Sequence, residues 1–143
     1  MAEDLDADFI FDDLEDREAP MNRLASAVIG AAIEVHRLLG PGHIESAYEN
    51  ALAIEFRLRG IPFGRQVVVD VFYKGENVGR DRLDFVIDRQ LIVEVKAVDS
   101  LAAIHAAQVI SYLRVTKHKL ALLINFNVRA LKDGIRRIAN TAN

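Results

Sequence analysis

Three charged side chains lie in two short apolar segments near the middle of the chain. Asp84 is in RLDFVID, and Glu94 and Lys96 are in LIVEVKAV. If these segments pair as antiparallel strands, the apolar residues fix the parity of the register, and pairing Phe85 with Val93 places Asp84 directly opposite Glu94. Lys96 then follows two residues along on the same face. The same pairing puts Leu83, Ile87, Leu91 and Val95 together with Phe85 on the other face. The pattern therefore predicts two carboxylates and an amine at one point of a sheet.

Two carboxylates at that spacing repel each other unless a cation lies between them. A hard divalent ion, Mg²⁺ or Mn²⁺, suits such an oxygen cluster, and Lys96 beside it would position a water or stabilise developing negative charge. The alternative is a solvated outer face on which Lys96 simply neutralises Glu94. Because LIVEVKAV is otherwise apolar on both faces, a strand covered on both sides is favoured.

The stretch GPGHIESAYENAL offers a third carboxylate, Glu45, at the start of an expected helix. With Gly42 as N-cap, Glu45 would be the third helical residue and could bond back to the capping amide. Alternatively its carboxylate points at Asp84 and Glu94, which is the interpretation we adopt. Tyr48 is expected to be a packing tyrosine with a hydrogen-bonded hydroxyl.

The elements that would position these residues follow from the spacing of apolar residues. Helical spacing predicts helices over residues 21–39, 43–59, 100–116 and 130–140, with Ser100 as an N-cap. Strand patterns, rich in β-branched and aromatic residues, cover residues 65–75, 80–88, 90–98 and 119–127, with a turn at 74–77 and a tight connection at 88–90. We therefore expect an α/β fold with a central mixed sheet flanked by helices.

Composition narrows the classes of protein. The 143 residues suit a single domain, and no apolar run is long enough to span a membrane. The absence of cysteine excludes disulfides, thiol nucleophiles and zinc-thiolate sites, and we expect a cytoplasmic protein. The four histidines lack zinc-ligand spacing, and no glycine-rich phosphate loop is present.

Charge is unevenly distributed along the chain. Residues 1–20 hold nine acidic residues and one arginine, whereas the remainder holds 12 acidic and 17 basic residues. We expect residues 1–20 to be a disordered acidic tail and residues 21–143 to form one domain. The basic body suits a polyanionic partner, although a solvated surface explains it equally. The tail could compete for a basic groove, solubilise the protein, or form an oligomer contact through Phe9-Ile10-Phe11.

At this point the sequence resembles a known family. Asp84, nine residues and then Glu94-Val95-Lys96 resemble the D-Xn-(D/E)-X-K signature of the PD-(D/E)XK nuclease superfamily, whose core order is α-β-β-β-α-β. Within it, GHIESAY resembles the motif of the GxxExxY protein family. The similarity extends over residues 22 to about 140, through RQVVVDVFYKG, RLDFVID, LIVEVKAV, HAAQVISYL and LLINFNV.

The resemblance implies roles for individual residues. Asp84, Glu94 and the Val95 carbonyl would be metal ligands, and Glu45 matches an acidic residue often supplied by the first core helix. Lys96 would orient the attacking water or steady the pentavalent phosphate.

Two further positions bear on the same resemblance. Gln108 and Tyr112 form a Q-x-x-x-Y pattern, similar to a helix motif that lines the active site in the exonuclease-like branch. Leu83 stands where the superfamily usually has proline.

The expected function is a metal-dependent nuclease that hydrolyses nucleic acid, with DNA the favoured substrate and Mg²⁺ or Mn²⁺ the cofactor. The alternative is a non-catalytic nucleic-acid- or protein-binding module that retains the nuclease scaffold. A homodimer or a partner subunit is left open, and no membrane association is expected.

Overall fold

The computed structural model describes residues 19–140. Their elements are α2 (Ala19–Leu39), α3 (Glu45–Leu58), β1 (Phe63–Tyr73), β2 (Glu76–Ile87), β3 (Leu91–Lys96), α4 (Ala103–Thr116), β4 (Leu120–Asn125), the 3₁₀ helix η2 (Leu131–Gly134) and β5 (Ile135–Ala139). Nearly all of the predicted acidic tail, with its Phe9-Ile10-Phe11 cluster, lies outside the described residues. Pro20 falls in the first turn of α2, where a missing amide hydrogen costs nothing.

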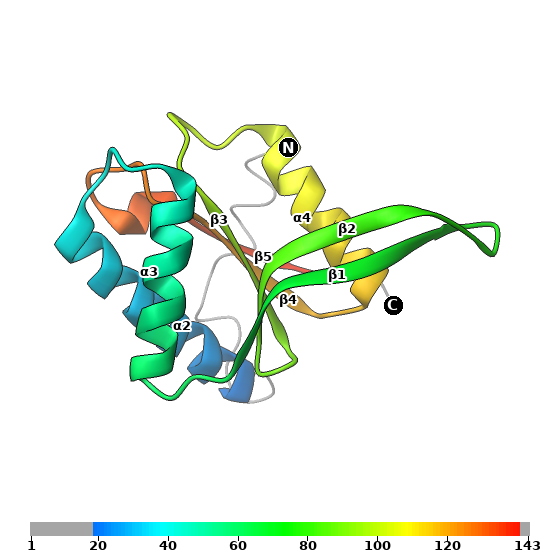
Figure 1. The fold of residues 1–143 in the computed structure, drawn as a ribbon, viewed down its shortest axis with the longest axis horizontal. Coiled ribbons are helices and arrows are strands. Elements are labelled where there is room, and N and C mark those ends of the chain that lie inside the picture. The colour runs from blue at the N-terminus through cyan, green and yellow to red at the C-terminus, as the bar shows by residue number, and fades with distance from the viewer. Residues whose placement is uncertain (1–18, 141–143) are drawn as a thin grey trace.

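The five strands form one mixed sheet in the order β1-β2-β3-β4-β5. Only β3 and β4 are parallel, and α4 connects them, whereas the other neighbours are antiparallel. Helices α2 and α3 lie on one side of the sheet and α4 on the other (Figure 1). The predicted α/β class, with a mixed sheet flanked by helices, is confirmed. Within residues 19–140, no helix has both the length and the apolar character needed to cross a bilayer.

Each side of the sheet has its own apolar core. On one side, the buried face of α2 and α3 packs against alternate residues of the central strands, among them Phe85, Val93 and Val95. On the other, α4 contributes Val109, Tyr112 and Leu113. Strand β3 is buried on both faces, as the apolar run LIVEVKAV predicted.

The hairpin of β1 and β2 is kinked where Gln66 faces Asp84. On one side of this point, the paired residues Arg65 and Phe85 face α3. On the other, the paired residues Val67 and Leu83 join the core beneath α4. Gln66 has a left-handed backbone with φ 53°. Leu83 was expected on the same face of the sheet as Phe85. That prediction is wrong, because beyond the kink Leu83 points to the α4 side of the sheet, whereas Phe85 points to the side of α2 and α3.

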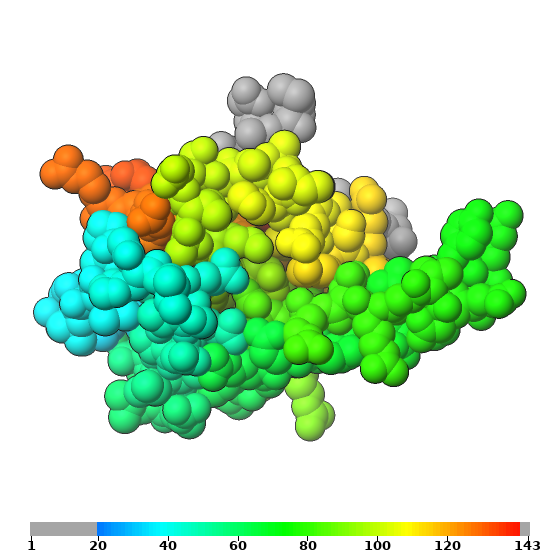
Figure 2. Space-filling view, turned by 45° about the horizontal axis from the view of Figure 1, so that its top comes forward, coloured from blue at the N-terminus to red at the C-terminus, as the bar shows by residue number. Residues whose placement is uncertain are grey.

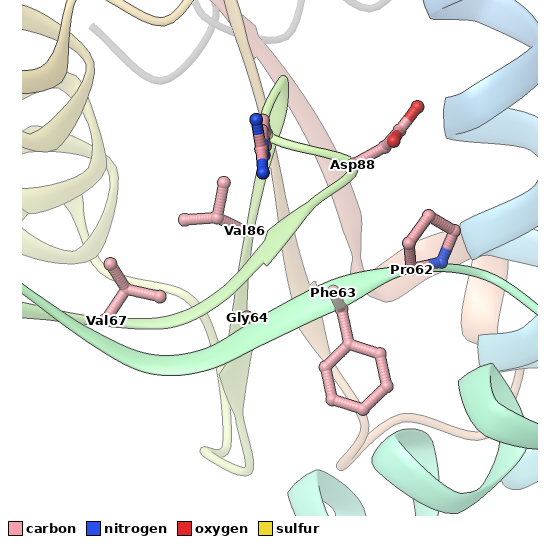
Figure 3. A pocket seen from close by; sticks show the side chains of 7 residues that line it. Pro62, Phe63, Gly64, Val67, Val86 and Asp88 are labelled. Carbon is pink, nitrogen blue, oxygen red and sulfur yellow. The ribbon is translucent and has the colours of Figure 1, made fainter.

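The kink directs the outer half of the hairpin away from the rest of the sheet as a projecting arm (Figure 1, Figure 2). Figure 3 shows the inner end of the hairpin, where Phe63 points to one side while Val67 and Val86 point to the other. These valines line a recess of about 350 Å³. Neither Asp84 nor Glu94 is among its lining residues, so we assign the recess no part in the site.

Two predictions near element ends are wrong. The expected final helix over 130–140 is instead η2 followed by β5, which pairs antiparallel with β4. A Cβ atom on Gly134 would lie 2.1 Å from the Asn125 carbonyl oxygen, so only glycine permits this close approach of two backbones. The expected N-cap at Ser100 is also wrong, because α4 starts later, with Ala102 as its N-cap residue.

Candidate active site

The centre of the site is the point where β2 and β3 separate. The predicted pairing of Phe85 with Val93 is confirmed, and it is the last ladder pair before the strands diverge. Beyond it, the Asp84 amide donates to Glu94 Oε2 at 2.7 Å. The Val95 amide donates to Asp84 Oδ2 at 2.8 Å. Each carboxylate thus binds the backbone of the opposite strand, which fixes the two acidic side chains next to each other.

Glu94 is 3% exposed, so the alternative of a solvated outer face does not hold for it. Burial, and secondarily repulsion by Asp84, raises the pKa of Glu94 from 4.5 to about 8. Burial also raises the pKa of Asp84, while the bond from the Val95 amide opposes that change. Such shifts arise where carboxylates share a desolvated site.

Lys96 and Glu45 complete the charged group. Lys96 favours the ionised forms of Asp84, Glu94 and Glu45, so its ammonium lies within electrostatic reach of all three carboxyls. Partial burial raises the pKa of Glu45, and Asp84 adds to that rise. Helix α3 starts at Glu45 with Ile44 as N-cap residue, so the expected cap at Gly42 is wrong. The electrostatic coupling places Glu45 near the strand pair.

The segment before Glu45 is held in place by Tyr48. This tyrosine is fully buried. Its hydroxyl donates to the Gly40 carbonyl at 2.6 Å and accepts from the His43 amide at 3.1 Å. Gly40 and Gly42 both have positive φ, at 66° and 103°, which favours glycine at these two turns. The prediction of a packing tyrosine with a bonded hydroxyl is confirmed, and its bonds fix the loop that leads to Glu45.

A second acidic residue of α3 was missed from the sequence. Glu49 lies one helical turn after Glu45 and is 8% exposed. Its Oε2 accepts from Arg65 Nε at 2.8 Å and from Gln66 Nε2 at 2.8 Å. Gln66 Nε2 also donates to Asp84 Oδ1 at 3.3 Å. The spacing of Glu45 and Glu49, which puts both on one helix face, was the signal in the sequence that could have indicated this residue.

Gln108 and Tyr112 approach the site from α4. Burial raises the pKa of Tyr112 to about 12, and Glu94 is the next cause, so this hydroxyl lies within electrostatic reach of the carboxylates. Gln108 is exposed and its side chain bonds to Tyr112. Both line a groove of about 570 Å³ between α4 and the hairpin, together with Val71, Asp81, Ile104, Ala107, Ser111, Arg114 and Val115. Figure 2 shows the surface hollowed between α4 and the hairpin.

The end of β3 is fixed on its other side by β4. The Lys96 carbonyl accepts from the Phe126 amide at 2.9 Å. Buried Asn125 accepts from the Val98 amide at 3.0 Å and donates to the Val98 carbonyl at 2.9 Å. The backbone around Lys96 is therefore held by hydrogen bonds to Asp84 of β2 on one side and to residues 125 and 126 on the other.

The donor set fits a hard divalent cation. Asp84 and Glu94 supply carboxylate oxygens, and each carboxylate has one oxygen that is not committed to a backbone amide. Burial raises the pKa of both groups, and repulsion by neighbouring carboxylates adds to that rise. Within residues 19–140, no group of three or more acidic or histidine side chains is close enough to hold a metal. Asp84 and Glu94 are therefore the acidic core of the site, and Glu45 stands further out.

Comparison with known proteins agrees with this geometry. The model of a protein family described as the PD-(D/E)XK nuclease superfamily matches residues 22–138. Searches of curated proteins and of solved structures return no significant match.

Proposed function

Since the chain belongs to the PD-(D/E)XK nuclease superfamily, we propose that it is a metal-dependent nuclease acting on nucleic acid, with DNA as the favoured substrate. Within the superfamily we place it in the GxxExxY family, on the pattern Gly42-x-x-Glu45-x-x-Tyr48. The structural part of that pattern has a physical explanation, because the glycine and the tyrosine shape the loop that brings Glu45 to the strand pair.

The observation that carries the proposal is the burial of Glu94 beside Asp84. An acidic side chain that is 3% exposed next to a second carboxylate costs stability in the metal-free protein. A divalent cation between the two would remove that cost. The arrangement is thus suited to binding a cation and poorly suited to a purely structural role.

The proposed roles follow from position. Asp84, Glu94 and the Val95 carbonyl would hold Mg²⁺ or Mn²⁺. Glu45 stands further out than these groups, and its carboxylate would have to move towards them to become a further ligand. When bound there, the ion would supply Lewis acidity, which neutralises phosphate charge and makes a water more acidic. Lys96, within electrostatic reach of three carboxyls, would orient the attacking water and stabilise the negative charge that develops on the phosphate.

Tyr112 and Gln108 would contact the substrate from α4. The Tyr112 hydroxyl, with its pKa raised to about 12, is protonated at neutral pH like that of any tyrosine, and it would donate a hydrogen bond. Gln108 is exposed in the groove beside the hairpin, where its amide would bind a backbone or base edge of the nucleic acid.

A cleavage panel tests the proposal. Purified protein would be incubated with labelled single-stranded, duplex and branched DNA, and with RNA, with Mg²⁺, Mn²⁺ or EDTA. We expect metal-dependent cleavage that Glu94→Ala and Lys96→Ala abolish. The controls Glu76→Ala and Lys132→Ala, which change exposed residues outside the site, should cut at the wild-type rate. If no substrate is cut, or if the two site variants cut normally, the enzyme proposal fails. Binding without turnover would then favour the alternative of a non-catalytic binding module.

A further inference from the structure

Gln66 occupies the one position where the kink of the hairpin meets the acidic pair. It lies in β1 opposite Asp84, between the ladder pairs Arg65 with Phe85 and Val67 with Leu83. Its φ of 53° is in the left-handed region, which a residue with a side chain rarely adopts. A strained backbone of this kind persists only where its surroundings hold it, and it is typical of functional sites.

The surroundings of Gln66 are two carboxylates. Its amide nitrogen donates to Glu49 Oε2 at 2.8 Å and to Asp84 Oδ1 at 3.3 Å. Glu49 is itself fixed, because the same oxygen accepts from Arg65 Nε at 2.8 Å. The amide of Gln66 is therefore anchored on α3 and extends from there to β2.

Asp84 is thereby fixed at both oxygens. Its Oδ2 accepts from the Val95 amide at 2.8 Å, and its Oδ1 accepts from Gln66. Two donors from different strands define the plane of the carboxylate, whereas the Val95 amide alone would leave rotation about that bond free. Outer partners of this kind orient ligating carboxylates and commonly change metal affinity by about tenfold or more when they are removed.

We propose that Gln66 is a positioning residue that sets the orientation of the Asp84 carboxylate, and that its left-handed backbone exists to deliver that amide. The proposal rests on the proposed function in that Asp84 is taken as a metal ligand. It adds a residue outside the D-Xn-(D/E)-X-K signature to the working parts of the site. Glu49 acts in it as an anchor for Gln66 and not as a ligand.

Gln66→Gly separates the effect of the left-handed backbone from that of the side-chain amide, because glycine tolerates the positive φ but carries no amide side chain. Lys74→Gly is the matched control, because Lys74 also has a left-handed backbone, with φ 50°, and lies exposed in the turn at the hairpin tip. Both variants relieve the same kind of strain, so Lys74→Gly should not lower the denaturant midpoint of unfolding, and any fall in the midpoint of Gln66→Gly reports the lost hydrogen bonds to Glu49 and Asp84. Only Gln66→Gly should alter the site.

The first measurement is a pair of crystal structures of the metal-free wild type and Gln66→Gly. We expect one Asp84 orientation in the wild type and a rotated or doubled orientation in the variant. The second is calorimetric titration with Mn²⁺, in which the dissociation constant should rise about tenfold for Gln66→Gly and stay unchanged for Lys74→Gly. An unchanged Asp84 orientation in Gln66→Gly would overturn the proposal. Because that readout needs no catalysis, a wild type that cuts no nucleic acid would refute the proposed function alone.

Discussion

Replacement of Glu94 by glutamine should stabilise the metal-free protein, and only at high pH. The pKa of Glu94 is raised to about 8 in the folded protein, against 4.5 in its ordinary state. Between these values the folded protein binds more protons than the unfolded chain, so the free energy of unfolding falls as pH rises. Below about pH 4.5 the carboxyl is neutral in both states and costs nothing. Above about pH 8 the full cost is present.

The size of the effect follows from the interval between the two pKa values. At about 1.36 kcal/mol per pH unit, the interval from 4.5 to about 8 sets an upper limit of about 5 kcal/mol. Water entry and local relaxation lower this figure, so we expect Glu94→Gln to gain about 2–3 kcal/mol at about pH 9 and close to zero at about pH 5. Glutamine keeps the oxygen that accepts from the Asp84 amide, so the fold of the strand pair should persist.

Urea unfolding followed by circular dichroism in EDTA measures the difference. Glu76→Gln is the matched control, since Glu76 is exposed on the hairpin and its replacement should have no pH-dependent effect. Adding Mn²⁺ should stabilise the wild type but not Glu94→Gln, because only the wild type would bind the ion tightly. A variant no more stable than wild type at about pH 9, or a gain of equal size at both pH values, would refute the reasoning.

Three further outcomes follow from the structure. Metal binding must displace the proton of Glu94. The Mn²⁺ association constant measured by calorimetry should therefore increase by up to about tenfold for each pH unit below about pH 8, and should be constant above that pH. Tyr48→Phe should cost about 1–3 kcal/mol in urea unfolding, because the variant leaves the Gly40 carbonyl without its donor while the ring still packs; an unchanged midpoint would contradict this. Gly134→Ala should cost at least about 1–3 kcal/mol, because its Cβ would lie 2.1 Å from the Asn125 carbonyl oxygen.

The acidic pair could be predicted from the sequence because strand pairing has strict parity. Alternation of apolar residues in RLDFVID and LIVEVKAV left few registers, and one of them pairs Phe85 with Val93. Once that pair is fixed, Asp84 and Glu94 must be neighbours. Their partners could not be predicted in the same way. Gln66 reaches Asp84 at a kink in β1, and Glu49 holds Gln66 from a helix, and both positions lie far from Asp84 in sequence.

The errors share a physical cause, which is backbone geometry that local propensity does not reveal. Residues 130–140 have apolar spacing suited to a helix, yet Ile135 to Ala139 pair with β4 as an edge strand. The parity rule also fails at Leu83, because it assumes an unkinked strand and the ribbon changes faces at Gln66. In both places one residue changes the path of the chain: Gly134 because it has no Cβ atom to block the Asn125 carbonyl, and Gln66 because its backbone is left-handed.

The energetic cost of Glu94 is also what separates the two functional classes. A scaffold used only for binding would need the shape of this side chain and the bond to the Asp84 amide, and glutamine offers both. An acid at this position is favoured only when something compensates its charge, and Lys96 lowers the pKa of Glu94 less than burial and Asp84 raise it. A divalent cation would compensate the charge fully. If Mn²⁺ stabilises the wild type but not Glu94→Gln, the acid is retained for the cation, and a binding module without metal chemistry no longer accounts for the site.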